Sequence, residues 1–156
     1  MKLYEHEAKT IISTYGVPTP RGKIANTCEQ VREYATIFGG SVVLKAQVLA
    51  AGRGKAGGIL FAQTPDEAGE AAAKLFGSNI KGEKVGEILV EEKLQIKKEL
   101  YFGITVDRLN RCYVAMASQM GGADIEEVAE REPQKSTKNL SPLGLASTVT
   151  MPGKSH

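Results

Sequence analysis

The chain has 156 residues, of which 42% are hydrophobic and 24% are charged, and its formal net charge is +2. These values are typical of a soluble globular domain or of two small lobes, and no apolar run approaches the roughly 20 residues that a membrane span needs. The small charge, with basic residues interleaved among acidic ones, argues against a nucleic-acid partner.

The first part of the sequence predicts two helices separated by strands. Apolar positions at helical spacing predict an amphipathic helix over residues 3–16. Residues 21–26 predict a short strand that follows an extended, proline-rich connector. Thr27 predicts the start of a second helix, because Gln30 completes a capping box. Residues 41–49, SVVLKAQVL, are apolar and β-branched and predict a buried strand.

The rest of the sequence continues the alternation of helices and strands. Thr64 and Pro65 mark the clearest helix start, and the segment DRLNR is a plausible hairpin turn. The resulting order of elements favours α+β layers over a doubly wound parallel sheet. The expected elements are a strand over 58–62, a helix over 64–77, strands over 86–94, 98–108 and 111–120, a helix over 121–132 and an irregular tail over 134–156.

Cysteine and histidine usage limits the chemistry of the chain. Cys28 and Cys112 stand far apart and form no CxxC pair, which suits a reducing, cytoplasmic location. The only histidines are His6 and His156. We therefore expect neither a Ser/His/Asp triad nor a zinc site built from histidine and cysteine. We predict no catalytic residue and no metal ligand.

The segment KAQVLAAGRGKAGG, residues 45–58, is the most distinctive stretch. Gly52, Gly54 and Gly57 fit the pattern GxGxxG, but a predicted strand follows them where a dinucleotide fingerprint needs a helix. A phosphate-binding Walker A loop is excluded because Lys55 is not followed by serine or threonine. What remains is a glycine-rich hairpin tip.

This hairpin tip has two interpretations that the pattern alone leaves open. Free backbone amides together with Arg53 and Lys55 would cover a polyphosphate, and Lys45 in the apolar strand is costly unless it meets an anion. The alternative is a mobile hairpin with solvated charges. Glu91 and Glu99 could present acceptors to a base or a ribose where the chain crosses between lobes, although each taken alone is an ordinary surface charge.

Four stretches together resemble the β subunit of the succinate–CoA ligase family. They are LYEHEAKTIISTYGVPTPRG, LKAQVLAAGRGKAGGI, ILVEEKLQIKKELYFGITVDR and AMASQMGGADIEEVAE, and they cover about residues 1–133 in the family's order. The resemblance implies an ATP-grasp fold with a nucleotide between two α+β lobes. One lobe would comprise about residues 20–98, and the other about residues 1–19 with 100–133.

The resemblance also implies roles for individual residues. Lys45 would contact phosphate oxygens, and Gly52, Arg53 and Gly54 would form a lid over the phosphates. Glu91 would meet the adenine amino group. The backbone of Leu94 would lie near the base, and Glu99 would bind the ribose hydroxyls.

The family makes an acyl-CoA from a carboxylate, coenzyme A and a nucleoside triphosphate, through a phosphohistidine on a partner α subunit. Its Mg²⁺ ligands, an acid and an asparagine on later strands, are not in this sequence, and neither is its coenzyme A ligase domain. We therefore expect weak ATP binding, an incomplete second lobe and no turnover by this chain alone. A non-catalytic nucleotide- or partner-binding module and a ligase for another acid remain alternatives. Leu49 and Ala51 stand where many members of the family have histidine and glycine.

Overall fold

The computed structural model describes residues 2–118 and 136–142. The chain divides into two compact units, Met1–Gln95 and Ile96–His156. Both units contain antiparallel strands, and the first also contains helices, which confirms the predicted α+β class. Within the described residues, every helix is too short or too polar to cross a membrane.

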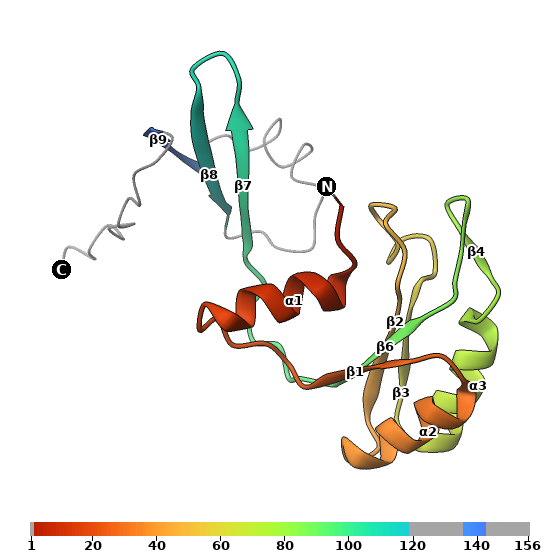
Figure 1. Cartoon of the computed structure of the whole chain (residues 1–156). Coiled ribbons are helices and arrows are strands. Elements are labelled where there is room, and N and C mark those ends of the chain that lie inside the picture. Colours follow the sequence, from red (N-terminus) through yellow and green to blue (C-terminus); the bar gives the residue numbers. More distant parts are fainter. Residues whose placement is uncertain (1, 119–135, 143–156) are drawn as a thin grey trace. The chain divides into compact units, whose positions relative to one another are not determined.

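A four-stranded sheet forms the centre of the first unit (Figure 1). Its strand order is β1-β6-β2-β3, and every neighbouring pair is antiparallel. The predicted hairpin around the glycine-rich segment is confirmed as the pair β2 and β3. The strand bounds are β1 (Gly22–Ala25), β2 (Val42–Ala46), β3 (Ile59–Ala62) and β6 (Ile88–Glu92).

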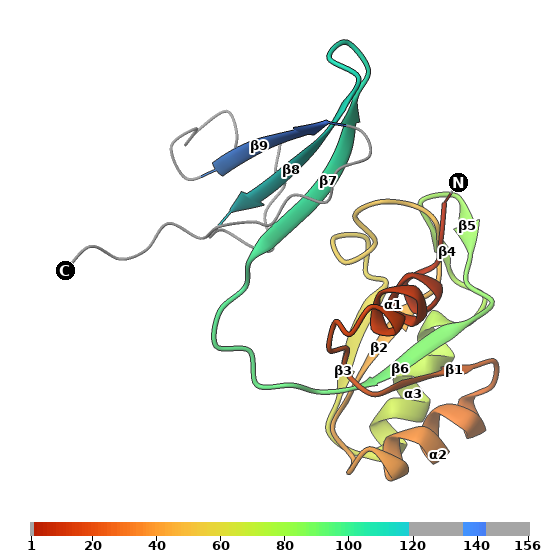
Figure 2. The ribbon, with the colours of Figure 1, turned by 60° about the vertical axis from the view of Figure 1, so that its left-hand side comes forward.

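Two helices, α2 (Cys28–Ile37) and α3 (Pro65–Leu75), cover one face of this sheet (Figure 2). Both begin as predicted, because Thr27 accepts the backbone N–H of Gln30 and Thr64 accepts that of Glu67. Alternate strand residues point at these helices and form the apolar core. The largest fully buried side chains are Leu44, Ile88, Val31, Val42, Val85 and Val90.

Helix α1 (Glu5–Thr14) lies over the other face of the sheet (Figure 2). None of its residues is buried, and it contacts the sheet through charged side chains. These contacts place α1 in the first unit. The grouping of residues 1–19 with residues 100–133 in one lobe, which the resemblance implies, stays a prediction.

A short hairpin between α3 and β6 was not predicted from the sequence. It consists of β4 (Asn79–Ile80) and β5 (Glu83–Lys84). Its two turn residues, Lys81 and Gly82, have positive φ angles of 51° and 89°. Positive φ at both central positions is typical of the two-residue turns that connect the two strands of a β-hairpin. The Lys-Gly pair was therefore the signal that could have indicated this hairpin.

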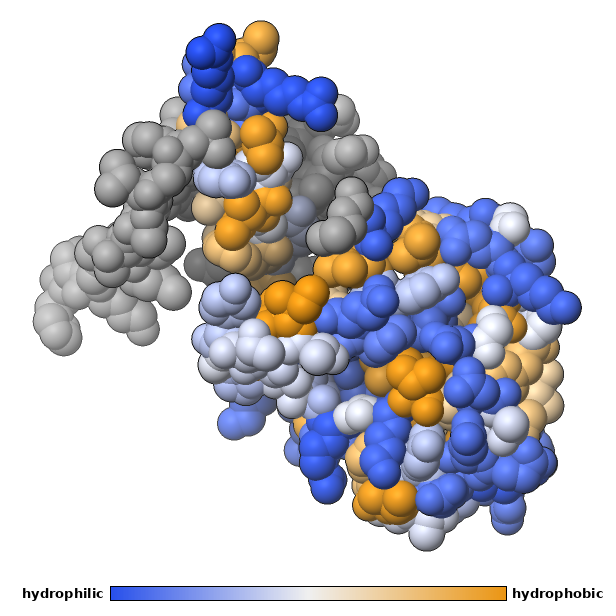
Figure 3. Space-filling model, in the orientation of Figure 1, coloured by the Kyte–Doolittle hydropathy of each residue, from blue (hydrophilic) through white to orange (hydrophobic). Residues whose placement is uncertain are grey.

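The second unit contains a three-stranded antiparallel sheet of order β7-β8-β9. Strands β7 (Tyr101–Asp107) and β8 (Cys112–Ser118) confirm the predicted hairpin. Its turn is closed by Asp107, whose carboxylate accepts the backbone N–H groups of Leu109 and Asn110. Alternate residues of β7 expose the apolar side chains of Phe102, Ile104 and Val106. Orange, hydrophobic atoms lie below the blue turn of this hairpin in Figure 3.

An irregular tail was predicted over residues 134–156, and strand β9 (Ser136–Pro142) corrects that prediction for its own residues, while the rest of the segment lies outside the described residues. It pairs along its whole length with β8. A β-ladder joins backbone groups, so a segment rich in polar residues can complete it without an alternation of apolar and polar side chains. The helix predicted over residues 121–132 lies outside the described residues.

Candidate functional site

Five charged side chains meet between α1 and the sheet of the first unit, and we call them the ionic cluster. They come from three different parts of the fold: helix α1, strands β2 and β6, and the glycine-rich loop. The members are Glu5, Lys9, Lys45, Arg53 and Glu91.

The register of the sheet brings two members of the cluster together. Strands β2 and β6 pair Val43 with Glu91 and Lys45 with Leu89, so Lys45 and Glu91 are diagonal neighbours on one face. Lys45 Nζ lies 2.5 Å from Glu91 Oε2. Glu91 is only 3% exposed. A lysine in an apolar strand is therefore tolerated here because it meets a buried carboxylate.

Helix α1 adds Glu5 and Lys9, which are four residues apart and therefore share one helix face. Lys9 Nζ lies 2.8 Å from Glu5 Oε1 and also donates to Glu91 Oε1. Burial lowers the pKa of the Lys9 ammonium, and its hydrogen bond to Glu91 partly opposes that shift. Each oxygen of Glu91 thus accepts a hydrogen bond from a different lysine.

Glu5 contacts all three cations of the cluster. Its Oε1 lies 3.0 Å from Lys45 Nζ and 2.8 Å from Lys9 Nζ. Its Oε2 forms an ion pair with Arg53 Nη2. Three cations and two carboxylates give the cluster a formal charge of +1. The cluster therefore retains an attraction for anions.

The glycine-rich loop turns back on itself and carries Arg53 into the cluster. Gly58 N–H donates to Arg53 O at 2.8 Å, and Arg53 Nη1 donates to Ala46 O at 3.2 Å. A Cβ on Gly58 would lie 2.8 Å from Ile80 Cδ1, so a larger residue would not fit there. Burial lowers the pKa of the Arg53 guanidinium, while the charge of Glu91 raises it.

The unpredicted hairpin β4–β5 holds the start of this loop. Glu83 Oε2 accepts the backbone N–H of Leu49 at 2.9 Å, and Lys81 Nζ donates to Ala51 O at 2.6 Å. Just beyond these anchors, the N–H groups of the segment Gly52–Gly54 have no acceptor among the described residues. Successive free amides next to cations are typical of an anion-binding loop.

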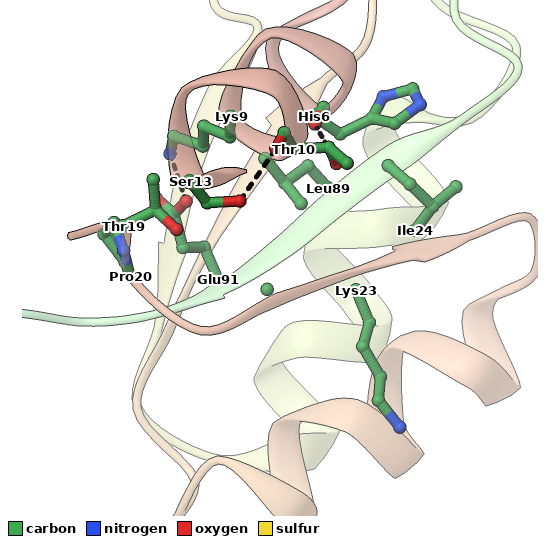
Figure 4. A pocket seen from close by; sticks show the side chains of 11 residues that line it. His6, Lys9, Thr10, Ser13, Thr19, Pro20, Lys23, Ile24, Leu89 and Glu91 are labelled. Atoms are coloured by element: carbon green, nitrogen blue, oxygen red, sulfur yellow. Dashed lines mark hydrogen bonds and ion pairs between the residues drawn. The ribbon is translucent and has the colours of Figure 1, made fainter. Parts of the chain in front are cut away.

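A polar pocket lies beside the ionic cluster, between α1 and the strands β1 and β6 (Figure 4). Its volume is about 250 Å³, and Lys9 and Glu91 belong to its lining. Leu89 and Ile24 supply apolar surface, while Thr10 on α1 contributes a hydroxyl. The pocket thus combines an apolar floor with charged and hydroxyl groups, a combination suited to a small polar molecule.

The structure brings three of the sequence-predicted residues together. Lys45, Arg53 and Glu91 all belong to the ionic cluster. In the structure, however, Lys45 and Arg53 contact carboxylates of this chain, and the Glu91 carboxylate is held by two lysines. Their roles toward phosphate and adenine stay predictions.

The other predicted residues are placed less closely. Gly52 and Gly54 flank Arg53, and only Gly52 of the two has a positive φ, at 72°. Leu94 is 53% exposed and lies beyond the end of β6. Glu99 is exposed and belongs to the second unit. Their proposed contacts with lid, base and ribose stay predictions too.

Sequence reasoning did not assign Glu5, Lys9, Lys81 or Glu83 to the site. The spacing of Glu5 and Lys9 marked a shared helix face, but nothing local indicated that this face meets β2 and β6. Within residues 2–118, no group of three or more histidine, cysteine or acidic side chains could hold a metal ion. The donors that are present, ammonium, guanidinium and amide groups, suit an anionic ligand.

Comparisons with known proteins identify a family and several relatives of the chain. The ATP-grasp domain family matches residues 2–143. The succinate–CoA ligase [ADP-forming] subunit β of Pyrobaculum arsenaticum is 53% identical over 135 residues, which are 86% of this chain and 35% of that protein. The [GDP-forming] subunit β of Thermus thermophilus is 50% identical over 134 residues, with the same coverage of 86% and 35%. The chain thus spans about a third of the length of these curated relatives.

A solved structure gives the same picture of the fold. It is the acetyl-coenzyme A synthetase 1 of Ca. Korarchaeum cryptofilum in complex with coenzyme A, Ca-AMPCP and HgCl⁺. It aligns with a TM-score of 0.73 and 26% identity over 92% of this chain and 62% of that chain.

Proposed function

The chain belongs to the ATP-grasp domain family, and we propose that its ionic cluster and glycine-rich loop bind the polyphosphate of a purine nucleoside triphosphate. One observation carries the proposal. Lys9, Lys45 and Arg53 come from three separate elements and converge on one place, where the formal charge of the cluster is still +1. Three converging cations beside free backbone amides form a site that a polyphosphate would fill.

The proposed roles follow from where each group lies. Lys45, fixed by the buried Glu91, would donate to phosphate oxygens from the floor of the site. Arg53 would donate from above, together with the amides of Gly52 and Gly54. The loop is pre-organised for this by its two anchors to the β4–β5 hairpin. When bound, the nucleotide would supply the phosphoryl group and this chain its binding and orientation.

The base and the ribose are proposed to lie next to the phosphates. The pocket of about 250 Å³ shares Glu91 and Lys9 with the ionic cluster, so a base there would adjoin the phosphate-binding cations. We propose that Glu91 faces the base, that the backbone of Leu94 lies near it and that Glu99 binds the ribose hydroxyls. Similarity to both ADP-forming and GDP-forming relatives leaves adenine and guanine as candidates.

For the whole reaction, we propose that this chain is the nucleotide-binding part of a succinate–CoA ligase β subunit. It would act with a partner α subunit and with Mg²⁺ in converting succinate, coenzyme A and ATP to succinyl-CoA, ADP and phosphate. The names of the relatives support this proposal. The likeness to an acetyl-coenzyme A synthetase supports a ligase for another acid as the second candidate.

The test is the variant Lys45→Met, with ATP binding measured by calorimetry. Losing a charge-assisted hydrogen bond to phosphate should weaken binding by about 10- to 100-fold. Lys74→Met is the matched control, since Lys74 is exposed on α3 on the opposite side of the sheet. Equal affinities of wild type and Lys45→Met would contradict the phosphate site.

A second measurement addresses the whole reaction. The chain is combined with an α subunit, coenzyme A, succinate and Mg²⁺, and acyl-CoA formation is followed; acetate replaces succinate in a parallel assay. ATP binding without formation of either product would favour a non-catalytic binding module.

A further inference from the structure

We propose that Glu5 is an internal anion that occupies the place of a phosphate group, so that a polyphosphate binds only by displacing its carboxylate. This inference rests on the proposed nucleotide site and adds a residue that determines which ligands that site accepts. It concerns the side chain of the first residue of α1.

The contacts of Glu5 are those expected of a bound anion. Its carboxylate touches Lys9, Lys45 and Arg53, which are all the cations of the ionic cluster. Glu91 makes ion pairs with only two of them, Lys9 and Lys45. Glu5 therefore sits at the point where the three positive charges converge, which is the place that a phosphate group would take.

Of the two carboxylates, Glu5 is the one that can leave. The Glu91 side chain is 5% exposed, and each of its oxygens accepts a hydrogen bond. The Glu5 side chain is 20% exposed. A carboxylate that is partly open to water can exchange its cation partners for solvent at a lower cost than a carboxylate that is almost fully buried.

Helix α1 does not depend on Glu5 for its first turn. The carboxylate of Glu7 accepts the backbone N–H of Tyr4 at 2.8 Å, and the backbone N–H of His6 donates to Gln47 Oε1 at 3.2 Å. These two bonds fix the start of the helix. Rotation of the Glu5 side chain toward solvent would leave both of these bonds, and the ion pair of Lys9 with Glu91, in place.

Competition with Glu5 would make the site selective for ligand charge. A singly charged anion would replace the Glu5 carboxylate with a group of the same charge, so its binding would bring no additional favourable interaction with the three cations. A triphosphate brings several negative charges and more acceptor oxygens, and can therefore satisfy the three cations better than Glu5 does. Competition with the Glu5 carboxylate therefore makes the site bind polyphosphates in preference to orthophosphate.

The test compares wild type with Glu5→Gln, which keeps the shape of the side chain but removes its charge. Binding of ATP, inorganic tripolyphosphate and orthophosphate to the full chain is measured by calorimetry. We expect Glu5→Gln to bind tripolyphosphate and ATP about tenfold more tightly, and the preference for tripolyphosphate over orthophosphate to shrink. Glu33→Gln is the matched control, because Glu33 is exposed on α2 and the same charge is lost away from the cluster.

The possible outcomes separate this inference from the proposed function. Unchanged or weaker tripolyphosphate binding by Glu5→Gln, with binding still lost in Lys45→Met, would overturn the inference and leave the nucleotide site standing. If Lys45→Met changes the affinity for ATP and tripolyphosphate neither in the wild type nor in Glu5→Gln, the proposed nucleotide site itself is wrong. Glu5→Ala should tighten binding in the same direction, and circular dichroism with urea unfolding checks that each variant is folded.

Discussion

The two faces of the four-stranded sheet carry different kinds of side chain on the same strands. In β2, Leu44 is fully buried against the helices α2 and α3, while its neighbour Lys45 points at α1. In β6, Val90 is fully buried on the same face as Leu44, while Glu91 lies on the same face as Lys45. Since side chains alternate along a strand, each strand serves the apolar core and the ionic cluster at once.

The two faces also differ in how their helices are held. Helices α2 and α3 bury apolar residues against the sheet, and apolar burial is the dominant favourable term in folding. Helix α1 has no buried residue and is held by ion pairs and hydrogen bonds. Partly exposed ion pairs contribute little to stability, so we infer that the core maintains the fold and the charged face is left available for binding.

The largest expected effect is on the apolar face. Leu44→Ala removes a fully buried side chain and leaves a cavity, and should lower the free energy of unfolding by about 3 kcal/mol. Urea unfolding followed by circular dichroism measures the loss. ATP binding by the folded fraction should change little, because Leu44 points away from the ionic cluster.

The adjacent residue on the opposite face is the control for this prediction. Val43→Ala removes apolar atoms from a half-buried position and should cost about 1 kcal/mol or less. Equal losses for Leu44→Ala and Val43→Ala would mean that the two faces contribute similarly to stability, and the proposed division between them would then be wrong.

The next largest effect is on the charged face. Glu91→Gln removes a carboxylate that is 3% exposed and leaves Glu5 as the remaining carboxylate of the ionic cluster beside Lys9 and Lys45. We expect a loss of about 2 kcal/mol, less than for a fully buried pair because both lysines keep some contact with water. The loss should shrink at high salt, which screens the repulsion between the lysines, whereas the loss in Leu44→Ala should not.

Glu92→Gln is the matched control, because it makes the same change at the next residue. Glu92 is paired with Arg21 at the surface, so its replacement should cost much less than that of Glu91. A larger loss of unfolding free energy for Glu92→Gln than for Glu91→Gln would show that burial does not determine how much these carboxylates contribute to stability.

The elements that could be predicted from the sequence have local causes. Thr27 and Thr64 mark helix starts because the bonds that they accept come from residues three positions away. The β2 strand and the β7–β8 hairpin follow from apolar, β-branched runs and from turn residues. The strand context and the glycine-rich pattern pointed to Lys45 and Arg53, and the resemblance gave Lys45, Arg53 and Glu91 roles toward a nucleotide that stay predictions. Local pattern alone left the glycine-rich loop with two interpretations.

The elements that were missed have causes that lie far away in the sequence. Lys9 and Glu91 are 82 residues apart, and Glu83 and Leu49 are 34 residues apart. No periodicity in one segment indicates which charged residue in another will face it. Strand β9 is similar, since it exists through backbone pairing with β8 and its side-chain pattern does not indicate a strand. Local patterns predict elements, whereas the ionic cluster depends on how the elements meet.

The smallest expected effect lies at the rim of the apolar face, where Glu92 is paired with Val42 across the strands. The backbone N–H of Arg21 and then its guanidinium hold the pKa of the Glu92 carboxyl below its usual value of 4.5. Because the pKa is lower in the folded state, the contribution of Glu92 to stability is complete well above pH 4.5 and is lost as the pH falls through the folded-state pKa. The difference in unfolding free energy between wild type and Glu92→Gln should therefore be small near pH 7 and should decrease further below pH 4.5. A difference that stays constant between pH 7 and pH 3 would show that Arg21 does not favour the charged form of this carboxyl, and that even the rim of the apolar face is insensitive to charge.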